Sequence, residues 1–136
     1  MMELILGALM MLQTGSPGVK TIVNSSMSSI EEPRQMVARN QTEWAALWRA
    51  HAGDKPAPKV DFDTTTVVAV FLGNRMSAGF SAEITGTHPQ GAALVVEWAE
   101  RRPDRDMVTA QVITTPAAIA AIPKFAGEIR FEKAKP

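Results

Sequence analysis

The stretch from Thr64 to Ile84, TTTVVAVFLGNRMSAGFSAEI, constrains the fold more than any other part of the chain. Its first half is a nearly continuous apolar run that ends at Gly73, as expected of a central strand covered on both faces. From Gly79 onward apolar and polar residues alternate, which is typical of a half-buried strand. The pattern therefore predicts two strands joined by a short polar loop over residues 74–78.

Further strands are expected on both sides of this pair. Short segments bounded by Ser-rich or Pro-containing turns, or alternating in polarity, predict strands at Lys20–Val23, Gln35–Ala38, Leu94–Trp98, Val108–Val112 and Glu128–Lys133. Residues 86–92 contain two glycines and a proline, which indicates a hairpin loop. In residues 116–124 the alanines favour a helix, but the flanking prolines and the short length favour an extended segment, which we prefer.

One helix is expected, over about residues 41–52. Asn40 is a suitable N-cap, Glu43 stands where a capping-box carboxylate reaches back, and Gly53 provides a stop. Four residues at helical spacing form one stripe: Trp44, Leu47, Trp48 and His51. The stripe either covers the sheet or binds a partner, and burial is the ordinary use of such a stripe in a small domain. His51 lies at its edge, packed or facing solvent.

These elements predict an α+β domain. An antiparallel meander of about five or more strands packs against the single main amphipathic helix, because a lone sheet cannot hide its apolar face from water. The chain has 136 residues, which suffices for one core. We therefore expect residues 19–136 to form a single domain.

Composition excludes several classes of function. Lys plus Arg and Asp plus Glu each number 14, so the net charge is zero and no field attracts nucleic acid or an anionic membrane. The chain has no cysteine, which excludes disulfides, thiolate nucleophiles and a lipoprotein anchor.

Residues 1–18 are expected to be a signal peptide or a flexible N-terminal segment. Leu4–Leu12 is an apolar run of the length of a signal-peptide core and too short to span a bilayer. No basic residue precedes it and Glu3 is acidic, so a short N-terminal helix is the alternative. The expected location is extracytoplasmic, either periplasmic or secreted, with the cytoplasm as the alternative.

No enzyme signature accompanies these elements. The chemically capable residues are Ser77, Ser81, His51, His88, Asp61 and Asp63. The serines lie in no nucleophile elbow, and the two aspartates flank Phe62 in a spacing typical of a turn. Neither a zinc-protease motif nor a calcium loop is present. We therefore expect no catalytic residue, no metal site and no cofactor.

Several of these residues resemble a known family. The segments that carry the resemblance are Trp44 with Leu47-Trp48, Val60–Phe62, Val68–Gly73, Ser77–Ile84, Thr115-Pro116 and Ile122–Lys124. They are similar to the C-terminal domain of PrcB-type protease-complex subunits, over roughly Pro33 to Phe131. The family favours Gly-Gly-Tyr before the alternating strand, whereas this chain has Ala78-Gly79-Phe80 and so lacks the hydroxyl.

The resemblance implies a non-catalytic accessory protein that associates with an extracytoplasmic protease and supports its stability. The expected partner is thus a protein. The candidate contact residues are those of the loop: Asn74, Arg75, Met76, Ser77 and Ala78, with Arg75 and Met76 as the main contact side chains. A plain hairpin connection is the alternative for this loop. The alternative function is a small protease inhibitor that presents the 73–80 loop to an active-site cleft.

Overall fold

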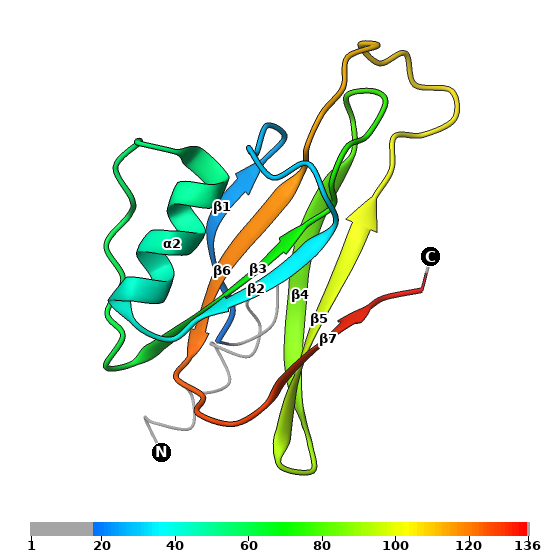
Figure 1. The fold of residues 1–136 in the computed structure, drawn as a ribbon. Coiled ribbons are helices and arrows are strands. Elements are labelled where there is room, and N and C mark those ends of the chain that lie inside the picture. Colours follow the sequence, from blue (N-terminus) through cyan, green and yellow to red (C-terminus); the bar gives the residue numbers. More distant parts are fainter. Residues whose placement is uncertain (1–17, 136) are drawn as a thin grey trace, which may run out of the picture.

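The structure, a computed structural model, describes residues 18–135 and forms an α+β domain (Figure 1). Its elements in chain order are β1 (Lys20–Ser25), β2 (Arg34–Ala38), α2 (Gln41–Ala52), β3 (Thr65–Phe71), β4 (Ser81–Gln90), β5 (Ala93–Arg101), β6 (Ala117–Pro123) and β7 (Ile129–Lys133). The apolar run expected to be a signal-peptide core lies outside the described residues.

The strands form two sheets. The first has the order β1-β6-β3-β2 with antiparallel neighbours, and the second has the order β4-β5-β7 with β7 parallel to β5. The simple antiparallel meander expected from the sequence is therefore not what forms. β3 and β6 are neighbours although the β4–β5 hairpin separates them in sequence, and β7 returns across the domain instead of pairing with β6.

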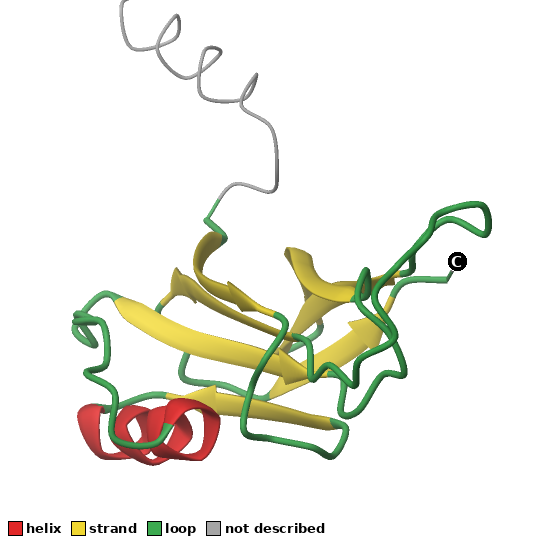
Figure 2. Ribbon diagram, turned by 90° about the horizontal axis from the view of Figure 1, so that it is seen from above, coloured by secondary structure: helices red, strands yellow, loops and turns green. Residues whose placement is uncertain are grey.

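β3 lies in the middle of three layers, because helix α2 covers one of its faces and the second sheet covers the other. Val67, Ala69 and Phe71 face helix α2, where they meet Trp44 and Leu47. The intervening residues Val68, Val70 and Leu72 face the second sheet, where they meet Ala82, Ile84, Val96 and Trp98. Figure 2 shows the helix under one face of the first sheet and the second sheet beyond it. This arrangement explains why β3 is apolar without interruption.

The helix begins and ends where its local sequence dictates. Asn40 has an extended backbone, and its side-chain oxygen accepts a 2.8 Å hydrogen bond from the Glu43 N–H. The Glu43 carboxylate reaches back to the N–H of Arg39, one residue before the cap. Gly53 adopts φ 66° and closes the C-terminus. Trp44, Leu47 and His51 are buried on the sheet side, and Trp48 is half-buried.

Of three further predictions about strands, one agrees with the structure and two differ from it. Residues 117–123 are extended, as preferred from the sequence, and form β6. The expected 86–92 loop is mostly strand, because β4 continues to Gln90 and the turn is confined to Gly91 and Ala92. The predicted strand at Val108–Val112 is wrong for this structure, since that segment has no ladder partner among the described residues.

Candidate functional site

The loop at residues 74–78 is held in shape at both ends by glycine. Gly73 has φ 80° and Gly79 has φ 98°, conformations that side chains other than glycine rarely adopt. A Cβ at Gly73 would lie 2.9 Å from Pro33, and one at Gly79 would lie 2.8 Å from Pro103. Both positions therefore require glycine for backbone geometry and for close approach.

The loop is also tied to the segment that precedes β6. Arg75 and Thr114 exchange two backbone hydrogen bonds of 2.8 and 2.9 Å. The N–H of Ala78 donates to the carbonyl of Ala110 at 3.0 Å, and the Thr114 hydroxyl donates to the carbonyl of Ser77 at 3.0 Å. The loop and residues 110–114 thus run side by side in opposite directions.

The side chain of Arg75 turns inward. Its Nε and one terminal nitrogen donate to the two oxygens of Glu100 at 2.7 and 3.0 Å. The other terminal nitrogen donates to the carbonyls of Leu72 and Asn74 at 3.0 and 2.9 Å, and the guanidinium lies 5.9 Å from the centroid of the half-buried Phe80 ring. Every guanidinium nitrogen is thus used inside the domain, a role that the sequence did not predict.

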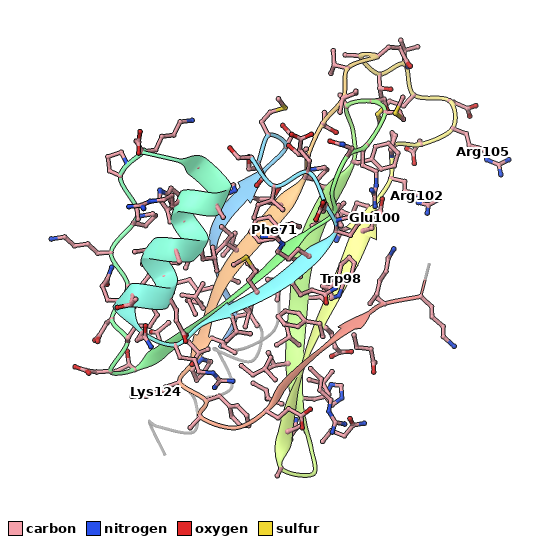
Figure 3. All side chains as sticks on the ribbon, viewed as in Figure 1. Phe71, Trp98, Glu100, Arg102, Arg105 and Lys124 are labelled. Carbon is pink, nitrogen blue, oxygen red and sulfur yellow. The ribbon has the colours of Figure 1, made fainter. Side chains whose placement is uncertain are left out.

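Glu100 is the centre of this ion-pair cluster (Figure 3). Its side chain is only 4% exposed, and Lys133 of β7 also lies 3.2 Å from the carboxylate while stacking 5.3 Å from the Trp98 ring centroid. The hydrogen bond from Arg75 lowers the pKa of Glu100 to about 2; burial opposes this shift, and Lys133 assists it. The cluster therefore joins the loop, β5 and β7 through one ionised carboxylate.

Large apolar side chains are exposed at the end of the molecule where this loop lies. Within residues 18–135 the exposed large hydrophobic residues are Met27, Met76, Met107, Val108, Val112 and Ile113, which we call the apolar end. Met27 pairs with Thr115 through an isolated bridge, and Met76 belongs to the loop bonded to residues 110–114. Figure 1 shows the three contributing connections gathered at the top of the view.

Sequence reasoning identified one member of the apolar end and missed five. Met76 is 74% exposed and Asn74 is also exposed, whereas Ser77 and Ala78 are half-buried. The other members come from residues 26–30 and from the segment 102–113, which we call the arm. The alternation at residues 108–112 signals an extended segment but not that its apolar side chains are exposed. The loop and the arm are joined by the Ala78–Ala110 backbone hydrogen bond and together carry five of the six members of the apolar end.

The chemically capable residues are dispersed. His51 is buried and its Nδ1 lies 2.8 Å from the Ser28 hydroxyl, while His88 on β4 lies 3.3 Å from Glu97. The Ser77 hydroxyl donates to the carbonyl of Ala78, and the Asp61 carboxylate accepts from the N–H of Asp63, forming the expected turn. Burial, followed by the charge of Lys55, lowers the pKa of His51, which indicates a neutral imidazole packed in the core.

Two further surveys bear on the site. In the part of the chain from Gly18 to Lys135, no cluster of three or more His, Asp or Glu side chains could hold a metal ion. No helix in the same range is long and apolar enough to cross a bilayer.

One comparison with known proteins finds a family match. Residues 66–123 match the family model described as PrcB C-terminal. The resemblance to the PrcB-type family is thereby confirmed. The match begins in β3 and ends with β6, so it contains the loop, the β4–β5 hairpin and the arm, and it covers less than half of the chain. No curated protein and no solved structure matches the chain.

Proposed function

We propose that this PrcB-like domain is a non-catalytic interaction module, an accessory subunit that binds and stabilises an extracytoplasmic protease. The apolar end is its docking surface. The observation that carries the proposal is the concentration there of every large exposed hydrophobic side chain in residues 18–135. Exposed apolar surface of this kind marks an interaction site.

The composition of the surface agrees with this use. Three of its six members are methionines, whose flexible thioethers adapt to a partner and are enriched at protein interfaces. Arginine is likewise enriched at interfaces. Arg102 and Arg105 project outward from the arm in Figure 3. Met76 is the proposed central contact, with Asn74 beside it, whereas Arg75 positions the loop from within.

The PrcB C-terminal match supports the choice of a protease as the partner. The alternative is a protease inhibitor, since the 73–80 loop is short and is fixed by the Arg75–Glu100 ion pair as an inhibitory loop would be. The two functions differ in what happens to a bound protease: a stabilising subunit leaves its activity in place, and an inhibitor removes it.

The test is binding and activity measured together. The purified protein is titrated against a panel of extracytoplasmic proteases, with binding followed by calorimetry and activity by peptide cleavage. Saturable binding with retained activity and a longer thermal half-life of the protease supports the stabilising role. Inhibition at one equivalent supports the inhibitor instead.

Two variants locate the surface in the same assay. Met76→Asp places a charge where the interface core would lie, and we expect at least a tenfold loss of affinity. Thr85→Asp is the matched control, because Thr85 is exposed on β4 and lies outside the apolar end. Equal affinity of both variants would remove the apolar end from the proposal.

Export is part of the same proposal. N-terminal sequencing of the mature protein from its host checks it directly. A mature chain that begins near residue 18 agrees with the proposal, and a mature chain that retains Met1 in the cytoplasm contradicts it.

A further inference from the structure

The arm has the sequence of a strand but lacks a strand partner. Between Met107 and Ile113 the chain reads MVTAQVI, with β-branched residues at four of seven positions. Val108 is 97% exposed, and Val112 and Ile113 are 52% and 59% exposed. Residues with this strand preference are normally paired with a neighbouring strand and partly covered. The segment therefore has the composition of a strand, but its own domain provides no neighbouring strand.

One edge of this segment is unpaired from residue 108 onward, whereas the Met107 N–H donates to the Asp104 carbonyl at 3.0 Å. Within residues 18–135, no backbone N–H from residues 108 to 113 donates a hydrogen bond to another protein group. The bonds that do form lie on the other edge: the Ala110 carbonyl and both backbone groups of Thr114 contact the 74–78 loop. Successive residues of an extended chain direct these groups to opposite edges. When the segment is extended, Thr109, Gln111 and Ile113 therefore direct theirs away from the loop.

The side-chain order of the segment is symmetric about Ala110. In an antiparallel pair of two identical segments centred there, Val108 lies opposite Val112 of the second copy and Met107 lies opposite Ile113 of the second copy. Thr109 and Gln111 then lie opposite one another, so polar residues also meet polar residues. In the same register, Thr109 of one copy and Gln111 of the other form a hydrogen-bonded pair. Their N–H groups, which are unpaired within the domain, then donate to the second copy.

Charge permits this contact. Arg102 and Arg105 are balanced by Asp104 and Asp106 next to the segment, and the chain has 14 basic and 14 acidic residues. Two copies therefore approach without net repulsion.

We propose that a second copy of this chain adds to the outer edge of residues 107–113 as an antiparallel strand, with the twofold axis at Ala110. The resulting contact is isologous and closed, so it forms a dimer and not a fibre. It leaves the 74–78 loop on the opposite edge of the segment, whereas Met107, Val108, Val112 and Ile113 of the apolar end contact the second copy. The second copy and a protease therefore compete for these four residues. A single strand pair buries less than a standard interface of about 1,600 Å², so we expect a concentration-dependent dimer.

The first experiment is sedimentation velocity on the full-length protein from about 5 μM to about 500 μM, a range chosen for a weak interface. Wild type shifts from monomer to dimer across this series. Gln111→Pro removes an outward-facing N–H and raises the dissociation constant at least tenfold, with an unchanged thermal midpoint because the position is exposed. A protein that remains monomeric at the highest concentration overturns the proposal.

The second experiment tests the register by crosslinking. Ala110→Cys introduces a cysteine at the twofold axis, where the two Cα atoms of a non-hydrogen-bonded pair lie about 4.5 Å apart, close enough for a disulfide. The chain has no cysteine of its own, so any disulfide dimer is unambiguous. Thr85→Cys is the exposed control. Rapid oxidation of Ala110→Cys to a dimer, with slow oxidation of the control, supports the proposal, and equal rates overturn it.

The third experiment uses charge complementation. Val108→Lys and Val112→Glu each weaken self-association, because each places an unmatched charge opposite a valine of the second copy. A mixture of the two variants restores a heterodimer, in which Lys at position 108 faces Glu at position 112 of the other copy and the remaining valines pair. Failure of the mixture to associate more tightly than either variant alone excludes this register.

Discussion

At the scale of single residues, Glu100 explains how a charged side chain can be almost fully buried in a small domain. Arg75 donates two parallel hydrogen bonds to it and Lys133 donates a third. A carboxylate removed from water in this way stays ionised only because its partners compensate for the lost hydration. The loop conformation and the charge state of Glu100 therefore depend on each other.

Replacing Glu100 by Gln tests this dependence. The variant keeps the shape but removes the charge, leaving two cations next to a neutral amide, and we expect unfolding to become about 2 kcal/mol easier. Urea unfolding followed by tryptophan fluorescence measures the change. Glu97→Gln is the control on the same strand, with a 43% exposed side chain and an expected change within about 0.5 kcal/mol. Equal losses would show that the cluster contributes nothing.

The same cluster predicts a response to acid. Because the pKa of Glu100 is lowered from 4.5 to about 2 in the folded protein, the unfolded chain takes up this proton first as the pH falls. The contribution of Glu100 is complete above about pH 4.5 and is lost progressively toward pH 2. We expect the wild type to lose more stability than Glu100→Gln across this window. Parallel pH curves would contradict the assignment.

His51 predicts a second pH effect, at higher pH. Ser28 accepts a hydrogen bond from the N–H of Ile30, so its own proton is available to donate to Nδ1 of His51. Since burial lowers the pKa of His51 below 6.5, protonation favours the unfolded chain. Stability is therefore full above about pH 6.5 and falls below it.

Thermal midpoints between pH 7.5 and 5 measure this effect. We expect the decline to be smaller in His51→Gln, which cannot take up a proton. His88→Gln is the exposed control, since the His88 side chain is 42% exposed. A wild-type decline that persists in full after the His51 substitution would assign it to another group.

At the scale of elements, the helix was predictable to the residue because its signals are local. The Asn40 cap and the Gly53 stop act within one turn of the chain, and both are present as expected. The β3 strand was predictable for a related reason, since its uninterrupted apolar run requires cover on both faces.

Asn40→Ala tests the helix cap. Losing the hydrogen bond that the Glu43 N–H donates to the Asn40 side-chain oxygen lowers the free energy of unfolding by about 1 kcal/mol. Chemical denaturation measures it, with Gln41→Ala as the neighbouring exposed control, for which we expect little change. A cost below that of the control would mean that the Glu43 carboxylate alone suffices as a cap.

Pairing could not be predicted in the same way. The alternation at Val108–Val112 indicates an extended segment with an apolar side, but a strand also needs a neighbour, and no local residue specifies one. Likewise, residues in β7 do not reveal whether their neighbour is β6 or β5, because side-chain alternation is the same in both cases. The meander was the wrong prediction for this reason.

At the scale of the whole molecule, helix α2 and the two sheets form three layers, and the apolar end lies beyond them. The helix covers one face of the first sheet and the second sheet covers the other, so the core needs no further cover. The apolar end lies outside both hydrophobic clusters. Of this surface the sequence predicted only the 74–78 loop, since the approach of residues 26–30 and of the arm depends on tertiary contacts.

In the proposed function, the domain binds a protease through the apolar end. The most direct measurement is affinity purification of the tagged full-length protein from its native host, with quantitative mass spectrometry. Wild type is compared with a Met27→Asp, Met76→Asp double variant and with Thr85→Asp. We expect a protease to be enriched by wild type and by the Thr85 control and to be lost with the double variant. Retention of the same protease by the double variant, or enrichment of no protease by wild type, would contradict it.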